Sequence, residues 1–237
     1  MQKFLRASIK ALFDNHGWHF KRIPEVEFFR HHKIDLVIDV GANEGQYAEQ
    51  LRRRGYRGQI MSFEPVSDAF AILERKSASD SGWSVFQSAL GSTLGEAEIN
   101  ISHSTVFSSF NEINDLGSAL SKDTVVVRRE TVPITTLDRI AGTETARRPF
   151  LKIDTQGFEQ KVLEGGATFL NRCEGLQLEL PIGHIYDGVW NFREALAYVE
   201  ALGFVPAQFA PINPMPDDPT SAIEFDCIFR RIRPTAL

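Results

Sequence analysis

A turn of small residues between a strand-like and a helix-like segment is the first feature of the sequence that suggests chemistry. The segment from Val37 to Gly45 reads Val-Ile-Asp-Val-Gly-Ala-Asn-Glu-Gly, with Gly41, Ala42 and Asn43 at the turn. Small residues let a ligand approach the backbone, and the N–H groups at the start of the next helix favour a carboxylate or a phosphate. The turn therefore predicts a nucleotide-like ligand that contacts residues 41–45.

Two residues of this segment discriminate between such ligands. Asp39 lies two residues before Gly41, at the tip of the predicted strand, where it would repel a pyrophosphate and attract an ammonium. Asn43 occupies the place of the second glycine in the dinucleotide-binding fingerprint, and its side chain would crowd a diphosphate. S-adenosylmethionine carries an ammonium, a carboxylate, a ribose and an adenine but no phosphate. The turn therefore fits S-adenosylmethionine better than NAD.

Two further strand ends are typical of an adenosine site. Glu64, followed by Pro65, ends the second predicted strand, where a carboxylate can accept hydrogen bonds from both ribose hydroxyls. Ser88, Ala89 and Leu90 follow the third predicted strand, where we expect the adenine ring. An ordinary strand end explains these three residues equally well. Glu64 supports an adenosine ligand without choosing between NAD and S-adenosylmethionine.

Carboxylates and histidines after the later strands are the candidates for catalysis. Methyl transfer to a hydroxyl requires that the acceptor oxygen be aligned with the methyl group and lose its proton. Asp154 and Glu179 end the fourth and fifth predicted strands, at the rim where the methyl group should arrive. His184 follows the fifth strand and is a second candidate for the base. His103 and Tyr186 are predicted to contact the acceptor.

Structural explanations for these residues stay open beside the catalytic ones. A carboxylate at a strand end often caps the next helix or pairs with a basic residue, and a single loop histidine often lies on the surface. Lys152, inside a predicted buried strand, is expected to neutralise a carboxylate. Asp154 and Glu179 could together bind a divalent cation, but the sequence offers no clear third oxygen ligand. We therefore predict no metal site.

Strands and amphipathic helices alternate along the chain and would position these residues. We expect helices over residues 44–54, 67–76, 158–171 and 192–202, and strands over residues 34–40, 59–63, 83–86, 151–154, 176–180, 204–209 and 224–230. Nearly continuous apolar strands indicate a mostly parallel sheet with helices on both faces, the doubly wound, Rossmann-like α/β class. Ligands bind to such sheets beyond the carboxyl ends of the strands.

The pattern predicts one domain with two additions. Residues 34–237 form the predicted domain, and residues 91–135 interrupt it as a β-rich, hairpin-like insertion. Residues 1–33 form a predicted helical extension that packs on the domain, with an apolar helical repeat over residues 2–14. Four prolines (Pro211, Pro214, Pro216 and Pro219) predict a stiff loop before the last strand.

Composition and charge disfavour several classes of protein. The chain of 237 residues has 26 basic and 31 acidic residues and a formal net charge of -5, so we expect no nucleic-acid partner. The sequence has no long apolar run, so we expect neither a membrane span nor a signal peptide, and a cytoplasmic location. Cys173 and Cys227 belong to no metal-binding or disulfide motif. The oligomeric state stays open, a homodimer included.

Six short motifs follow one another along the chain: Val-Ile-Asp-Val-Gly-Ala-Asn-Glu-Gly-Gln (37–46), Ser-Phe-Glu-Pro (62–65), Ala-Leu-Gly (89–91), Thr-Thr-Leu-Asp (135–138), Leu-Lys-Ile-Asp-Thr-Gln-Gly-Phe-Glu (151–159) and Val-Leu-Glu-Gly-Gly (162–166). Over about residues 34–230 this series resembles the FkbM family of S-adenosylmethionine-dependent O-methyltransferases. The resemblance implies a class I methyltransferase fold, with an antiparallel strand near the C-terminus, and a donor bound by Asp39, Gly41, Asn43, Gly45 and Glu64.

The resemblance also implies the kind of acceptor. Members of the family methylate hydroxyls of sugars and natural products, so we expect a sugar or a glycosylated small molecule. The segment over residues 177–188 resembles members that act on deoxysugars, such as rhamnose, in bacterial glycolipids.

Two other functions remain as alternatives. An NAD-dependent oxidoreductase or epimerase is disfavoured by Asp39 and Asn43, and by the lack of a Tyr-x-x-x-Lys pair. A binding module that recognises adenosine without catalysis is disfavoured by the carboxylates and histidines expected at the rim.

Overall fold

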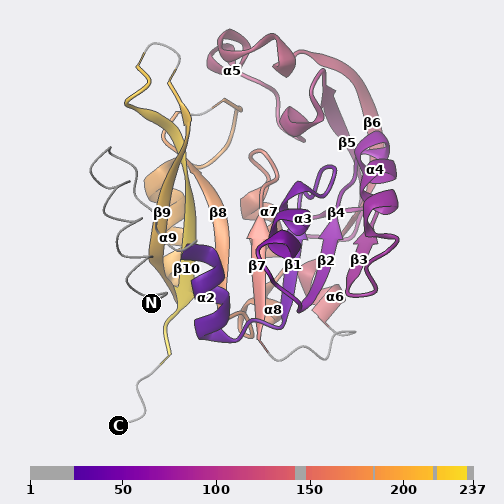
Figure 1. Ribbon diagram of the computed structural model, residues 1–237. Coiled ribbons are helices and arrows are strands. Elements are labelled where there is room, and N and C mark those ends of the chain that lie inside the picture. The colour runs from indigo at the N-terminus through magenta and orange to yellow at the C-terminus, as the bar shows by residue number, and fades with distance from the viewer. Residues whose placement is uncertain (1–23, 142–147, 184, 216–217, 234–237) are drawn as a thin grey trace, which may run out of the picture.

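The computed structural model describes residues 24–141, 148–183, 185–215 and 218–233, which build a central sheet of seven strands (Figure 1). The strand order is β3-β2-β1-β7-β8-β10-β9. The strands are β1 (Leu36–Val40), β2 (Gln59–Phe63), β3 (Trp83–Phe86), β7 (Pro149–Ile153), β8 (Gly175–Pro181), β9 (Phe204–Pro214) and β10 (Ala222–Arg231). Strand β10 is antiparallel to both neighbours and the other pairings are parallel, which confirms the predicted fold class.

Helices cover both faces of this sheet (Figure 1). One face packs against α2 (Pro24–His32), α3 (Gln46–Arg53) and α4 (Ser67–Ser77), and the other against α6 (Leu137–Ala141), α7 (Glu159–Glu164), α8 (Ala167–Leu170) and α9 (Phe192–Ala201). Successive strand residues alternate between the two cores, as Val37 and Ile38 do in β1. Because both faces are covered, all five residues of β1 are buried.

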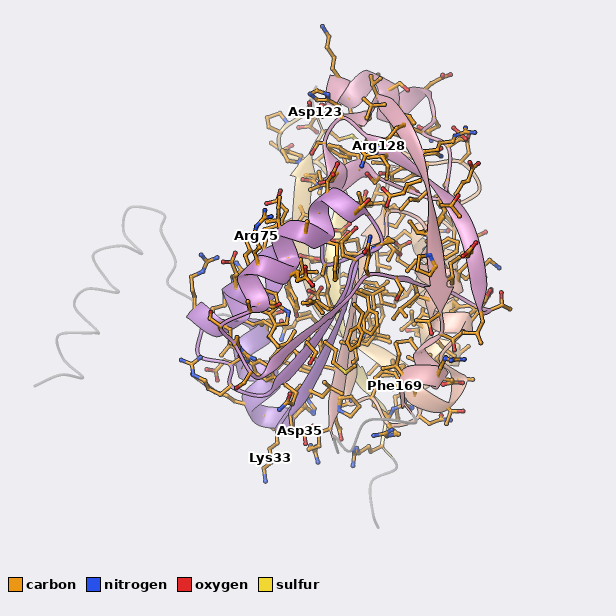
Figure 2. The ribbon with its side chains drawn as sticks, turned by 90° about the vertical axis from the view of Figure 1, so that its right-hand side faces the viewer. Lys33, Asp35, Arg75, Asp123, Arg128 and Phe169 are labelled. Atoms are coloured by element: carbon orange, nitrogen blue, oxygen red, sulfur yellow. The ribbon has the colours of Figure 1, made fainter. Side chains whose placement is uncertain are left out.

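A second sheet of three strands belongs to the β-rich segment expected over residues 91–135. Strands β4 (Ala89–Leu90), β6 (Val126–Thr135) and β5 (Gly95–Ser102) form it, with β5 antiparallel to β6. Between β5 and β6 lie η1 (Thr105–Phe107), α5 (Asp115–Leu120) and η2 (Lys122–Thr124). We call residues 89–135 the arch, because they curve over one end of the main sheet (Figure 1). Asp123 in the arch lies at the opposite end of the molecule from Lys33 (Figure 2).

The single helix predicted over residues 158–171 is wrong, because the chain breaks there into α7 and α8. A Cβ atom on Gly165 would lie 2.0 Å from the carbonyl oxygen of Gly91, and one on Gly166 would lie 2.7 Å from Leu137 Cδ1. The two glycines therefore mark a close approach of the backbone to the arch and to α6.

The proline-rich loop expected before the last strand is shorter than predicted. Strand β9 continues through Pro211 to Pro214. It is the edge strand of the sheet, where a residue without an N–H donor is tolerated. Pro216 lies outside the described residues.

The N-terminal extension is described only from residue 24 onward, and the helix predicted over residues 2–14 lies outside the described residues. Helix α2 packs on the main sheet through Phe28 and Phe29. Their ring centroids lie 5.6 and 4.7 Å from the ring centroid of Phe150. Within the described ranges, no helix has the length and apolar character needed to cross a membrane.

Candidate active site

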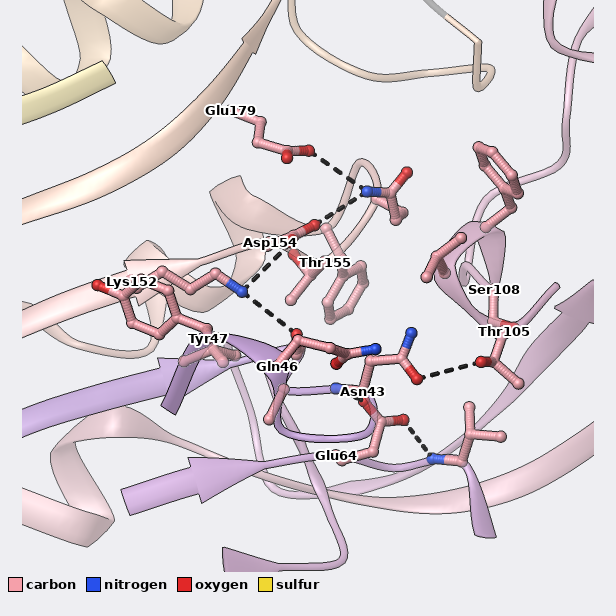
Figure 3. Close-up of a pocket in the computed structure, with 18 of the residues that line it drawn as sticks. Asn43, Gln46, Tyr47, Glu64, Thr105, Ser108, Lys152, Asp154, Thr155 and Glu179 are labelled. Carbon is pink, nitrogen blue, oxygen red and sulfur yellow. Dashed lines mark hydrogen bonds and ion pairs between the residues drawn. The ribbon is translucent and has the colours of Figure 1, made fainter. Parts of the chain in front are cut away.

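A cavity of about 750 Å³ lies at the carboxyl ends of the parallel strands, beside the arch. Its wall includes most of the predicted donor-binding residues together with both predicted catalytic carboxylates, namely Gly41, Ala42, Asn43, Glu64, Pro65, Ala89, Leu90, Asp154 and Glu179. Figure 3 shows the part of this wall between Glu64 and Glu179. Residues expected to bind a donor and residues expected to act on an acceptor therefore share one space.

The turn after β1 requires a glycine at its first position. Gly41 has a φ of 74°, and a Cβ atom there would lie 1.8 Å from the carbonyl oxygen of Asp154. The N–H groups of Gly41 and Ala42 both donate to the carbonyl oxygen of Phe63, at 3.0 Å. Gly45 has a φ of 85° and precedes α3 without lining the cavity. The turn is thus fixed between β2 and β7.

Asn43 links this turn to the arch. It has a φ of 47°, and its Oδ1 accepts a hydrogen bond of 3.1 Å from the hydroxyl of Thr105. Asn tolerates the left-handed region better than most residues with a side chain, because its amide bonds locally. The side chain of Asn43 therefore bonds to the arch, and both Asn43 and Thr105 line the cavity.

Glu64 is buried at the edge of the cavity and bonded to the turn. Its Oε2 accepts from the N–H of Asn43 and its Oε1 accepts from the N–H of Val66, both at 2.8 Å. Burial raises the pKa of Glu64 to about 7, although both backbone donors lower it. Each oxygen keeps a lone pair that can accept from a ligand hydroxyl. Of the residues predicted around the adenine, Ala89 and Leu90 line the cavity and Ser88 does not.

Asp39 does not line the cavity, contrary to the expectation that it meets an ammonium of the ligand directly. It is fully buried between β2 and β7, where its register partners are Ser62 and Lys152. The hydroxyl of Ser62 donates to Asp39 Oδ2 at 3.1 Å, and Lys152 Nζ lies 3.3 Å from Oδ1. The ammonium that faces Asp39 is therefore the protein's own.

Lys152 pairs with a second carboxylate, which confirms the prediction that it neutralises one. Its Nζ lies 3.2 Å from Asp154 Oδ2, and a dashed line marks this ion pair in Figure 3. Burial lowers the pKa of Lys152, but Asp154, Asp39 and Glu179 outweigh burial and raise it above its ordinary value. Lys152 therefore stays charged beside the cavity.

Asp154 and Glu179 are joined in the cavity wall by one side-chain amide. Gln156 Nε2 donates to Asp154 Oδ1 at 2.9 Å and to Glu179 Oε2 at 3.3 Å (Figure 3). Burial raises the pKa of Glu179 well above its ordinary value, and the charges of Asp154, Glu224 and Asp226 raise it further. This environment makes Glu179 hold a proton more readily than an ordinary glutamate does.

Sequence reasoning missed three residues of this part of the cavity wall: Gln156, Glu224 and Asp226. Glu224 and Asp226 come from β10, whose antiparallel register sets Asp226 opposite Glu179. The alternation of polar residues in the last strand could have indicated that Glu224 and Asp226 share one face. The pairing of β10 with β8, which brings them to Glu179, could not be read from the sequence. Gln156 stands between the predicted Asp154 and a glycine, in a segment whose loop conformation the sequence did not indicate.

Of three residues predicted on the acceptor side, the structure describes two, and neither of these lines the cavity. His184 lies outside the described residues. His103 is exposed and does not line the cavity, whereas the nearby residues 105–108 do. Tyr186 is buried behind the wall, and its hydroxyl lies 3.0 Å from Gln156 Oε1 and 3.1 Å from the carbonyl oxygen of Phe107. Among the residues that the structure describes, no three His, Cys, Asp or Glu side chains form a group suited to a metal ion.

A doubly wound sheet with its antiparallel seventh strand, a glycine turn after β1 and an acidic residue after β2 define a Rossmann-like class I methyltransferase. Residues 39–206 match the Methyltransferase FkbM domain, and the chain belongs to that family. No curated protein sequence is significantly similar to the chain.

Solved structures share the fold at low sequence identity. The methyltransferase FkbM of Methylobacillus flagellatus is 12% identical with a TM-score of 0.51, over 83% of this chain and 43% of that one. This chain thus spans less than half the length of that relative. An rRNA methylase of Streptococcus thermophilus is 14% identical with a TM-score of 0.48, over 90% of this chain and 99% of that one. A Burkholderia thailandensis 1,6-didemethyltoxoflavin-N1-methyltransferase is 11% identical with a TM-score of 0.45, over 88% and 76% of the two chains.

Proposed function

We propose that the protein transfers a methyl group from S-adenosylmethionine to a hydroxyl oxygen of a sugar, such as a deoxysugar on a glycolipid or natural product. The observation that carries this proposal is the single cavity that joins the turn and Glu64 at one end to Asp154 and Glu179 at the other. Membership in the methyltransferase family supports the reaction class and gives no support to the NAD-dependent alternative.

The donor end of the cavity has the groups that an adenosine and an amino acid need. The turn at Gly41, Ala42 and Asn43 lines the cavity. Glu64 offers acceptor oxygens for ribose hydroxyls, and Ala89 and Leu90 offer an apolar surface for an adenine. When bound, S-adenosylmethionine supplies a methyl group already activated by the sulfonium.

The acceptor end has the groups that remove a proton from a hydroxyl. In the proposed mechanism Asp154 accepts this proton, because Lys152 and Gln156 stabilise its charged form and it lines the cavity. Glu179 orients the acceptor through its own hydrogen bonds. Carboxylates line this end from β8, from β10 and from the loop after β7, and they would repel a phosphate while accepting hydrogen bonds from a polyol. The proposal therefore keeps a neutral sugar as the partner and not a nucleic acid.

Calorimetry and an acceptor screen test the proposal. We expect S-adenosylmethionine and S-adenosylhomocysteine to bind and NAD not to bind, and we expect a rhamnoside or related glycoside to gain the mass of one methyl group. Asp154→Asn should lower kcat at least 100-fold with the donor Kd within about twofold. Asp187→Asn, on an exposed residue outside the cavity, should leave both unchanged. Binding of NAD alone would contradict the proposal, and equal losses of kcat and donor affinity in Asp154→Asn would make Asp154 a binding residue.

A further inference from the structure

We propose that Gln156 is the positioning residue of the active site, and that its side-chain amide holds Asp154 and Glu179 in one fixed arrangement toward the acceptor. This inference rests on the proposed function, in which the two carboxylates face the acceptor hydroxyl. A single nitrogen atom, Gln156 Nε2, donates hydrogen bonds to both carboxylates.

The hydrogen bonds determine the orientation of the amide. Gln156 Nε2 has two hydrogens, and the two carboxylates at 2.9 and 3.3 Å can each accept one. Gln156 Oε1 lies 3.0 Å from the hydroxyl of Tyr186, which can donate to it. The reversed orientation would direct a carbonyl oxygen at both carboxylates and lose both hydrogen bonds. Tyr186, which does not line the cavity, thus acts by fixing the amide.

The backbone at Gln156 is in a conformation that favours glycine. Its φ is 54°, in the left-handed region, where a side chain is unfavourable. Hydrogen bonds from the arch hold this conformation, because Ser109 Oγ donates to the carbonyl oxygen of Gln156 at 2.6 Å and Asn111 Nδ2 donates to that of Gly157 at 2.9 Å. The arch therefore holds a strained residue whose side chain reaches between the two carboxylates, which is typical of a functional position.

Charged and titratable groups from several elements surround Asp154 and Glu179. These groups come from four elements and one loop: Lys152 on β7, Glu224 and Asp226 on β10, Asp39 on β1, Glu159 on α7 and Tyr186 after β8. Lys152 pairs with Asp154 and with Asp39. The Gln156 amide adds a donor that Asp154 and Glu179 share, and so offsets the repulsion between them when both are charged.

A glycine substitution separates this role from a purely structural one. Gln156→Gly removes the amide and also relieves the left-handed backbone, so the unfolding temperature should equal or exceed that of the wild type. We expect kcat to fall at least tenfold, the donor Kd to stay within about twofold, and the acid limb of the pH–rate profile to move to higher pH. Gln156→Glu keeps the shape of the side chain but loses both donors, and should show the same loss of kcat.

Lys33→Gly is the matched control. Lys33 has a φ of 53°, is exposed, and lies at the far end of the molecule from the arch (Figure 2). Relief of backbone strain there should raise the unfolding temperature and leave kcat and the pH profile unchanged. If Gln156→Gly behaves like Lys33→Gly in every measurement, the proposal is overturned.

A titration of the free protein separates this inference from the proposed function. In protein with ¹³C-labelled glutamate carboxyls and no donor or acceptor, Glu179 should titrate at a higher pH in Gln156→Gly than in the wild type. Tyr186→Phe should shift it in the same direction by less, because the amide remains but loses its orienting partner. An unchanged titration overturns the positioning role. Failure of the wild-type protein to methylate any acceptor overturns only the proposed function.

Discussion

Asp39 and Lys152 face each other across β1 and β7, with Oδ1 and Nζ 3.3 Å apart and both side chains buried. Desolvation of a buried charge costs several kcal/mol, so each of these charges depends on the other. The pair also lies directly behind the glycine turn, since Lys152 Nζ is 3.4 Å from the carbonyl oxygen of Gly41. Asp39 is therefore connected to the cavity wall through Lys152, which lines the cavity, and not by its own side chain.

Lys152→Met should lower the free energy of unfolding by about 3 kcal/mol at pH 7, because it leaves the carboxylate of Asp39 buried without its cation. Asp39→Asn in the same protein removes the uncompensated charge and should recover most of this loss. Urea denaturation of the two single variants and the double variant measures both effects. Losses that simply add in the double variant would mean that the two residues are not coupled.

Gly41→Ala should abolish donor binding and lower the free energy of unfolding by more than 3 kcal/mol. Its Cβ atom would collide with the backbone of Asp154 at 1.8 Å, and neither backbone can move without breaking the turn. Gly55→Ala is the control, because Gly55 has a φ of 93° but nothing within 4 Å of an added Cβ atom. This control measures the cost of the left-handed conformation alone, about 1 kcal/mol. Similar losses in the two variants would contradict the close approach at Gly41.

Much of the main sheet could be predicted because its strands are buried on both faces and appear as short apolar runs. The predicted bounds of β2 and β3 agree with the structure. Helix α7 and helix α8 were not separated, because Gly165 and Gly166 are explained only by contacts with the distant Gly91 and Leu137. Local pattern carries no information on such contacts.

The lining of the cavity was predictable where a residue lies near the carboxyl end of a strand, as Glu64, Asp154 and Glu179 do. The position of a side chain was not predictable where its contacts come from distant parts of the chain. The position of Asp39 depends on the pairing of β1 with β7, which brings Lys152 against it. The exposure of His103 and the buried position of Tyr186 depend on how the arch folds over the cavity, which strand and helix patterns do not determine.

Glu64→Gln should change the pH dependence of stability. The pKa of Glu64 is about 7 in the folded protein because of burial, against an ordinary value of 4.5. The folded state binds this proton more tightly than the unfolded state, so ionisation lowers stability as pH rises from 4.5 to about 7. The stability of Glu64→Gln relative to the wild type should therefore increase by about 3 kcal/mol over this range. Urea denaturation at several pH values measures it, and a constant difference would contradict the raised pKa.

Donor affinity should depend on the same ionisation. The charged carboxylate of Glu64 is the better acceptor for ribose hydroxyls, so the Kd of S-adenosylhomocysteine should fall as pH rises through about 7. Calorimetry between pH 6 and pH 8 should show this change in the wild type and not in Glu64→Gln. The same pH dependence in both proteins would assign it to another group and remove Glu64 from the ribose site.

Thr105→Val should weaken donor binding although Thr105 belongs to the arch. The variant removes the hydrogen bond of 3.1 Å to Asn43 Oδ1 and leaves that oxygen without its donor at the turn. Loss of one such bond costs about 1 kcal/mol, so the donor Kd should rise about fivefold while the far end of the cavity is unaffected. Thr131→Val, on an exposed residue of β6, is the control and should bind the donor as the wild type does. An unchanged Kd in Thr105→Val would mean that the arch covers the donor turn without stabilising it.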